Sequence, residues 1–200
     1  MNESAVRRPI LLFVLMLGML AAGCQRTAEP PPLAGATMGG PFALAGSTGG
    51  TVRDSDFAGK YRIVYFGYSF CPDVCPVDLQ VVGAGLRSFE QSDPDRAARV
   101  QPLFVTVDPE RDTLDVLRAY AANFHPRLIG LRGSEEETAR VARAYGVYYN
   151  RAAPARPGAE YLVNHSRMIV LYGPQGEPVA ILPHDQGPAA LAAELDRWVR

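Results

Sequence analysis

Residues 61–76 read YRIVYFGYSFCPDVCP, a near-continuous apolar run that ends in two cysteines. The β-branched and aromatic residues of this run are those of a strand buried on both faces. Residues 77–90 follow with apolar side chains at helical spacing, and Pro76 suits the first helical position. The stretch therefore predicts a buried strand, a short loop that carries Cys71, and a helix capped by Cys75.

Strand and helix signals alternate on both sides of this stretch. Residues 41–44 and 50–52 predict a short hairpin, and residues 100–107 predict a second buried strand. Ser134, with Glu137 three residues later, forms a capping box that starts a helix. The remaining predicted elements are a helix at 113–124, a hairpin at 167–182 and a helix at 188–199.

This order of elements predicts the α/β class. We expect a thioredoxin-like fold, with a central mixed β-sheet flanked by helices and an N-terminal β-hairpin. Alternation alone does not separate this fold from other doubly wound sheets.

Composition describes an ordinary globular domain with appendages. The chain has 200 residues, of which 48% are hydrophobic and 20% charged, and this balance excludes a disordered chain. The net charge is −1, and no stretch concentrates arginine without nearby carboxylates. A nucleic-acid partner is therefore not expected, because such binders carry a basic face.

The N-terminal residues resemble a bacterial lipoprotein signal. Arg7 and Arg8 precede an apolar stretch at 10–22, which is too short to span a bilayer, and small residues then lead to Cys24. The pattern predicts a signal peptide at 1–23, lipidation of Cys24, and a membrane-anchored protein on the periplasmic face of a bacterial cell envelope. The alternative is an uncleaved signal anchor in which Cys24 is an incidental thiol.

Proline and small residues fill the next part of the chain. This composition predicts a semi-extended linker at 24–40, followed by the folded domain at 41–200.

Once Cys24 is assigned to lipid, two cysteines remain, and they are separated by three residues. Thioredoxin-type redox motifs have two intervening residues, so the longer spacing favours metal binding over thiol exchange. A helix N-terminus stabilises thiolates, and thiolates suit Cu(I) or Zn(II), which an imidazole completes well. His165, just before the strand expected at 167–172, is the candidate third ligand; the alternative is a histidine in a surface loop.

Three segments together resemble the Sco (SenC/PrrC) family: the cysteine loop, residues 106–113 (TVDPERDT), and Asn164-His165-Ser166. The resemblance runs from about residue 41 to the C-terminus. Members are membrane-anchored thioredoxin-fold proteins that bind copper through two cysteines and one histidine and help to build the binuclear copper site of cytochrome c oxidase. The resemblance therefore implies that Cys71, Cys75 and His165 hold one copper ion per chain, as Cu(I) or Cu(II).

The function implied by the resemblance is that of a copper chaperone, which is not an enzyme in the turnover sense. Its partners would be the copper-bearing subunit of cytochrome c oxidase and, further, another periplasmic copper chaperone or a thiol-disulfide reductant. The alternative is a periplasmic thiol-disulfide oxidoreductase without obligatory metal, in which Cys71 and Cys75 form a redox disulfide. Thioredoxins carry a proline before the strand that faces their cysteines, whereas Ser166-Arg167 stands at that place here. A peroxide-reducing or redox-signalling protein of the same fold is a third hypothesis.

The remaining polar candidates receive lesser roles. Asp108 and Asp112 could form a carboxylate metal site, but they are better explained as loop-ordering residues. Asp108 would form a turn and support the metal centre from outside the ligand set, and Asp112 would cap the helix expected at 113–124. His125 and His184 are expected to be solvated loop residues.

Two further expectations concern the surroundings of the cysteines. Tyr68 and Phe70 are predicted to wall the site and to limit the access of water. Residues 150–161, rich in proline and glycine, are predicted to be a mobile loop whose motion brings His165 toward the metal.

Overall fold

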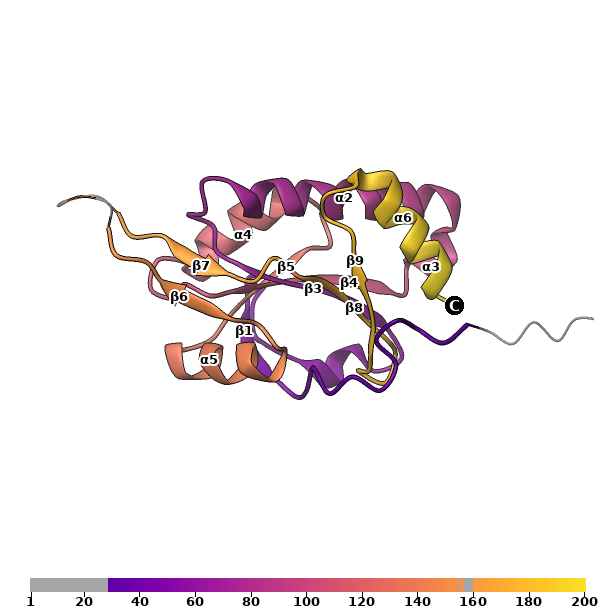
Figure 1. Cartoon of the computed structure of the whole chain (residues 1–200), viewed down its shortest axis with the longest axis horizontal. Helices are drawn as coiled ribbons and strands as arrows, with labels where there is room; N and C mark the ends of the chain where they lie inside the picture. Colours follow the sequence, from indigo (N-terminus) through magenta and orange to yellow (C-terminus); the bar gives the residue numbers. More distant parts are fainter. Residues whose placement is uncertain (1–28, 155, 157–159) are drawn as a thin grey trace, which may run out of the picture. The chain divides into compact units, whose positions relative to one another are not determined.

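A seven-stranded mixed sheet organises the molecule in the computed structural model, which describes residues 29–154, 156 and 160–200 (Figure 1). In spatial order the strands are β2 (Thr51–Arg53), β1 (Ala43–Gly46), β5 (Ile129–Arg132), β4 (Val100–Thr106), β3 (Tyr61–Gly67), β8 (Ile169–Tyr172) and β9 (Pro178–Leu182). The predicted N-terminal hairpin is β1 and β2, and the predicted C-terminal hairpin is β8 and β9.

Strand β3 lies near the middle of the sheet. It runs parallel to β4 and antiparallel to β8, and all seven of its residues are buried. Burial on both faces explains why its sequence is a near-continuous apolar run, interrupted by Arg62, and does not alternate. The loop that carries Cys71 and the start of the helix that carries Cys75 therefore follow directly from a strand held rigidly in the core.

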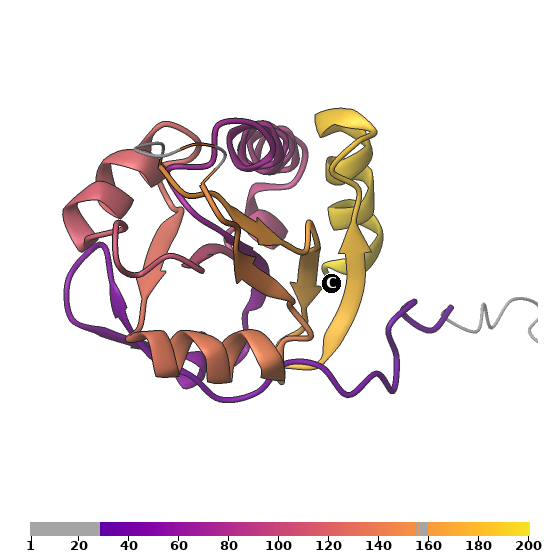
Figure 2. The same cartoon turned by 60° about the vertical axis from the view of Figure 1, so that its left-hand side comes forward.

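Helices cover both faces of the sheet. Figures 1 and 2 show α2 (Val74–Ser92), α4 (Leu114–Ala122) and α6 (Gly187–Trp198) over one face, and α5 (Glu135–Ala144) over the other. Two short helices, η1 (Asp54–Phe57) and α3 (Pro94–Ala97), complete the set in the described part of the chain. A Cβ atom at Gly85 would lie 2.9 Å from the Pro188 carbonyl oxygen, so glycine allows α2 and α6 to pack closely.

Helix α2 begins two residues earlier than the sequence predicts. Its first residue is Val74 and its N-cap is Asp73, so Cys75 lies inside the first turn rather than at the cap. Pro76 is the third helical residue. Proline is tolerated there because the first N–H groups of a helix have no intrahelical acceptor.

The caps of the next two helices differ in how well the sequence predicts them. Ser134 and Glu137 form the predicted capping box at α5. At α4 the cap is Thr113, whose side chain accepts from the Val116 N–H. The prediction that Asp112 caps this helix is wrong, because its carboxylate is buried and used elsewhere.

A second, two-stranded sheet was not predicted. Strands β6 (Tyr149–Arg151) and β7 (Val163–His165) pair antiparallel, with Tyr149 opposite His165. Figure 1 shows this hairpin extending beyond one end of the seven-stranded sheet. Residues 150 and 151 of the predicted mobile loop at 150–161 therefore belong to β6, and residues 155 and 157–159 lie outside the described residues.

Residues 31–200 form one compact unit that includes part of the predicted linker. The Leu33 N–H donates to the Val179 carbonyl at 3.1 Å, and Leu33 and Met38 pack against the hydrophobic core. The predicted signal peptide at 1–23 and Cys24 lie outside the described residues. None of the helices in the described part of the chain is long and apolar enough to cross a bilayer.

Candidate metal centre

The two cysteines meet where the central strand passes into α2. Cys71 lies in the loop after β3 and is 9% exposed, and Cys75 in the first turn of α2 is fully buried. The Cys75 N–H donates to Cys71 Sγ at 3.5 Å, and neither cysteine is in a disulfide. A Cβ atom at Gly67 would lie 2.8 Å from Cys75 Sγ, so the glycine that ends β3 leaves space for this sulfur.

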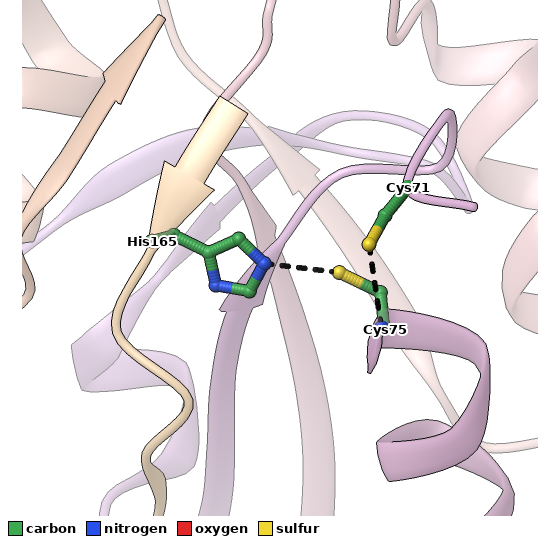
Figure 3. Close-up of side chains that lie close together, drawn as sticks. All are labelled: Cys71, Cys75 and His165. Carbon is green, nitrogen blue, oxygen red and sulfur yellow. Dashed lines mark hydrogen bonds between the residues drawn. The ribbon is translucent and has the colours of Figure 1, made fainter. Parts of the chain in front are cut away.

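His165, the last residue of β7, points its imidazole at these sulfurs (Figure 3). Its Nε2 lies 3.2 Å from Cys75 Sγ, and its Nδ1 lies 3.0 Å from the Ser166 carbonyl oxygen. Because a carbonyl only accepts, Nδ1 carries the proton and donates it there. Nε2 therefore presents a lone pair toward Cys75, as a metal-binding imidazole requires.

The structure thus brings together the three residues that the sequence analysis proposed as ligands. Cys71 Sγ, Cys75 Sγ and a ring nitrogen of His165 all lie within 4.8 Å of one another. Two sulfurs and one imidazole form a soft donor set, which suits Cu(I) or Zn(II) better than the hard cations that prefer oxygen. The donor chemistry of these residues therefore fits a soft metal ion.

The two thiols hold their protons very differently. A hydrogen bond from Cys75 lowers the pKa of Cys71 to about 3, against the opposing effect of burial. The same hydrogen bond, together with burial, raises the pKa of Cys75 above its ordinary value. At neutral pH the pair therefore shares one proton, which lies on Cys75, while Cys71 is a thiolate.

Aromatic rings flank the imidazole on two sides. Tyr65 and Tyr68 meet the His165 ring edge-on, with centroids 6.1 Å and 6.0 Å away. Tyr68 is 2% exposed and walls the site as predicted. The same prediction for Phe70 is wrong, because its side chain is 43% exposed and lies against the Arg111 guanidinium.

Asp112 anchors the cysteine loop instead of capping α4. Its buried carboxylate accepts from the Ser69 N–H at 3.1 Å, from the Ser69 hydroxyl, and from the Thr106 hydroxyl at 2.5 Å. Burial raises the pKa of this carboxyl. The sequence motif at 106–113 thus holds the residue two places before Cys71, a contact that spans more than forty residues of sequence.

Asp108 is also buried, and it is not part of the cluster of Cys71, Cys75 and His165. Its carboxylate accepts from Arg111 at 2.6 Å and from the Tyr161 hydroxyl at 2.8 Å. Asp108 therefore joins the loop after β4 to the chain that leads into β7. A supporting role for Asp108 beside the ligand set remains a prediction.

Of the other two histidines, His125 is not the solvated loop residue that the sequence predicts. It is 2% exposed, its Nε2 lies 3.3 Å from a Glu90 carboxylate oxygen, and burial lowers its pKa. His184 is partly buried beside Asp185. Neither histidine joins the cluster of sulfur and nitrogen atoms.

Sequence reasoning also missed Asp78 and Arg167, which form an ion pair beside the cluster, with Nη2–Oδ1 at 2.7 Å. A signal was present, because Asp78 is an acidic residue among the apolar positions of a predicted core helix.

Comparisons with known proteins agree with this fold. A family model described as SCO1/SenC matches residues 31–200. The human Protein SCO1 homolog, mitochondrial, is 36% identical over 168 residues, covering 82% of this chain and 53% of that protein. The bovine Protein SCO2 homolog, mitochondrial, is 44% identical over 137 residues, covering 68% and 50%. The chain spans about half the length of the curated relatives that it matches.

Among solved structures, Bradyrhizobium japonicum ScoI with copper bound aligns with a TM-score of 0.72 and 35% sequence identity. The alignment covers 80% of this chain and 99% of that one. The predicted thioredoxin-like fold is thereby confirmed. The family model covers most of the chain, and relatives above 30% identity support it, so this chain belongs to the SCO1/SenC family.

Proposed function

We propose that this protein is a copper chaperone that holds one copper ion between Cys71, Cys75 and His165 for delivery to cytochrome c oxidase. The observation that carries the proposal is the convergence of two thiol sulfurs and one imidazole nitrogen within 4.8 Å. The copper-bound relative aligned above adds support, because it shares the fold and family. Copper is then the protein's cargo, not a resident cofactor.

Each ligand is prepared for the ion in a different way. Cys71 is already a thiolate at neutral pH, and His165 directs its unprotonated Nε2 at the sulfurs because Nδ1 donates to Ser166. Cys75 must lose the proton that its raised pKa retains. Copper binding therefore releases about one proton, and affinity should rise about tenfold per pH unit in the neutral range.

The partner that we propose is the copper-bearing subunit of cytochrome c oxidase, as family membership implies. A second copper chaperone or a thiol reductant is a further proposed partner, which would keep the cysteines loaded and reduced. We also propose that the chain is exported and lipidated at Cys24, on the sequence pattern of residues 1–24. The curated relatives named above are mitochondrial proteins.

A metal-free oxidoreductase fits the site less well. Dithiol exchange needs the two sulfurs, but it does not need an imidazole lone pair directed at the buried one. Both chemistries require Cys71 and Cys75, so cysteine variants do not separate them. His165 does separate them.

The test replaces His165 by alanine and measures copper binding, oxidase assembly in cells and dithiol exchange. Copper affinity should fall at least about a hundredfold, since even the loss of a group that only supports a ligand costs 10- to 100-fold. Oxidase assembly should fail while dithiol exchange survives. His184→Ala is the matched control and should retain all three. Normal oxidase assembly by His165→Ala would contradict the chaperone function.

A further inference from the structure

Asp78 is a fully buried carboxylate in α2, one helical turn after Cys75. Residues three apart on a helix lie on the same face, so Asp78 and Cys75 face the same neighbours. A buried carboxylate is costly unless it is paired and hydrogen-bonded. Its partners therefore show what the carboxylate holds in place.

Three donor atoms converge on Asp78. The Arg167 guanidinium donates from Nη2 at 2.7 Å and from Nε at 3.2 Å, and the Tyr65 hydroxyl donates at 2.8 Å. Tyr65 belongs to β3, and Arg167 lies between β7 and β8. One carboxylate thus joins helix α2, the central strand and the segment that follows His165.

Both partners of Asp78 are immediate neighbours of His165. Arg167 follows it by two residues, and the Tyr65 ring meets the imidazole edge-on at 6.1 Å. On the other side, Asp78 lies in the same helix as Cys75. The ion pair therefore joins the same two parts of the chain, α2 and the segment around His165, as the 3.2 Å contact between His165 Nε2 and Cys75 Sγ.

Backbone hydrogen bonds alone do not fix the distance between His165 and α2. Strand β7 has three residues and pairs with β6, which is outside the seven-stranded sheet. The Val163 N–H donates to the Tyr68 hydroxyl at 3.2 Å, which is a hydrogen bond between uncharged groups. The charge-assisted hydrogen bonds between Arg167 and the buried Asp78 carboxylate are a stronger connection between this segment and α2.

We infer that Asp78 and Arg167 form a latch that positions His165 against Cys75 and so sets the third donor of the copper site. The inference rests on the proposed function and deepens it. Neither residue contacts the metal. They act through His165, so their removal should change nitrogen coordination more than it changes the thiols.

The test variant is Asp78→Asn/Arg167→Met, which removes both charges together. Removal of Arg167 alone would leave a buried unpaired carboxylate and could prevent folding. In the double variant, the side-chain oxygen of the introduced asparagine can still accept from the Tyr65 hydroxyl. If the double variant does not fold, Asp78→Asn alone takes its place, because Arg167 is 40% exposed and stays solvated.

Two readouts follow the histidine itself. In the copper-free reduced protein, an NMR cross-peak between the His165 ring and the Cys75 β-protons should be present in the wild type and lost in the variant. In the copper(II)-loaded protein, the nitrogen hyperfine coupling of His165 should weaken, and affinity should fall about 10- to 100-fold, as for other groups that orient a ligand. Dithiol exchange should change by less than about twofold, because the ion pair does not contact either sulfur.

Glu90→Gln/Arg127→Met is the matched control. It removes an ion pair of the same kind near the other end of α2. That end lies about 22 Å from Cys75 by the rise of an α-helix. The control should retain the cross-peak and the copper affinity.

The latch is wrong if the Asp78 variant keeps the His165 cross-peak and the wild-type copper affinity. This failure is distinguishable from failure of the proposed function. If the wild-type protein binds no copper, the proposed function is wrong, and the cross-peak in the copper-free protein still decides whether the latch exists.

Discussion

Cys71 and Cys75 follow the central strand of the core, whereas His165 ends a three-residue strand outside the main sheet. The cysteines lie four residues apart in one continuous strand, loop and helix. The histidine reaches them from ninety residues away through a hairpin whose outer strand, β6, has no buried residue. The two parts of the site are therefore held with different strength.

This difference indicates that the sulfurs and the imidazole have different freedom to move. The sulfurs are fixed by packing and by the buried Asp112, so they form a preset pair. The imidazole is placed by side-chain contacts that could open without unfolding the core. Under the proposed function, the two fixed sulfurs would keep the copper ion while the imidazole leaves it.

Besides the latch, a second contact holds the hairpin. Two guanidinium groups pack against the Tyr161 ring, with its centroid 3.7 Å from Arg111 Cζ and 4.1 Å from Arg151 Cζ. The Tyr161 hydroxyl also donates to Asp108.

The largest effect is expected at the anchor of the cysteine loop. Asp112→Ala removes the acceptor of the Ser69 N–H and the Thr106 hydroxyl inside the core. The free energy of unfolding should fall by about 3 kcal/mol, because buried donors are left without partners. Urea unfolding followed by circular dichroism measures it.

Asp115→Ala is the control on the same segment, since the Asp115 side chain is 87% exposed. Its free energy of unfolding should change by less than about 0.5 kcal/mol. Equal losses in the two variants would show that the cysteine loop is not specially anchored.

A smaller effect is expected in the histidine hairpin. Tyr161→Ala removes two cation–π contacts and the hydrogen bond to Asp108. The free energy of local opening of β6 and β7 should fall by about 1–2 kcal/mol. Hydrogen exchange at the amides of the hairpin measures this change.

Global stability should hardly change in Tyr161→Ala. Tyr148→Ala is the control, because Tyr148 is 67% exposed. If exchange in the hairpin were unchanged while the whole domain became less stable, the two regions would unfold as one unit and the comparison would be wrong.

The smallest expected effect concerns the alkylation rate of Cys71, which should hardly change with pH. Its pKa of about 3 makes it a thiolate from pH 5 to pH 8. Its alkylation rate by iodoacetamide, mapped by mass spectrometry, should vary less than about twofold over this range. An ordinary thiol would slow about 1000-fold between pH 8 and pH 5. A slope of that kind would show that Cys75 does not stabilise the Cys71 thiolate.

The same contrast explains which features could be predicted from the sequence. The strand, the cysteine pair and helix α2 are contiguous, so local pattern and spacing were sufficient. The capping box at Ser134 is equally local. His165 was predicted beside the cysteines from its place before the strand expected at 167–172 and from the family resemblance. The structure brings the three side chains together, although β8 begins only at Ile169.

Long-range polar contacts could not be predicted. Strands β6 and β7 are too short for a period-two pattern, so the sequence predicts a mobile loop at 150–161 and no hairpin. Asp112 and His125 were assigned to helix capping and to solvent, but both are buried by partners distant in sequence, such as Ser69 and Glu90. Pairings of this kind depend on the tertiary fold and leave no local signal.

X-ray absorption at the copper edge tests the central claim most directly. The reduced protein with one equivalent of copper should show two sulfur donors and one nitrogen donor, and the nitrogen should be absent in His165→Ala. A sulfur-only environment in the wild type, or a nitrogen donor that persists in His165→Ala, would contradict the account.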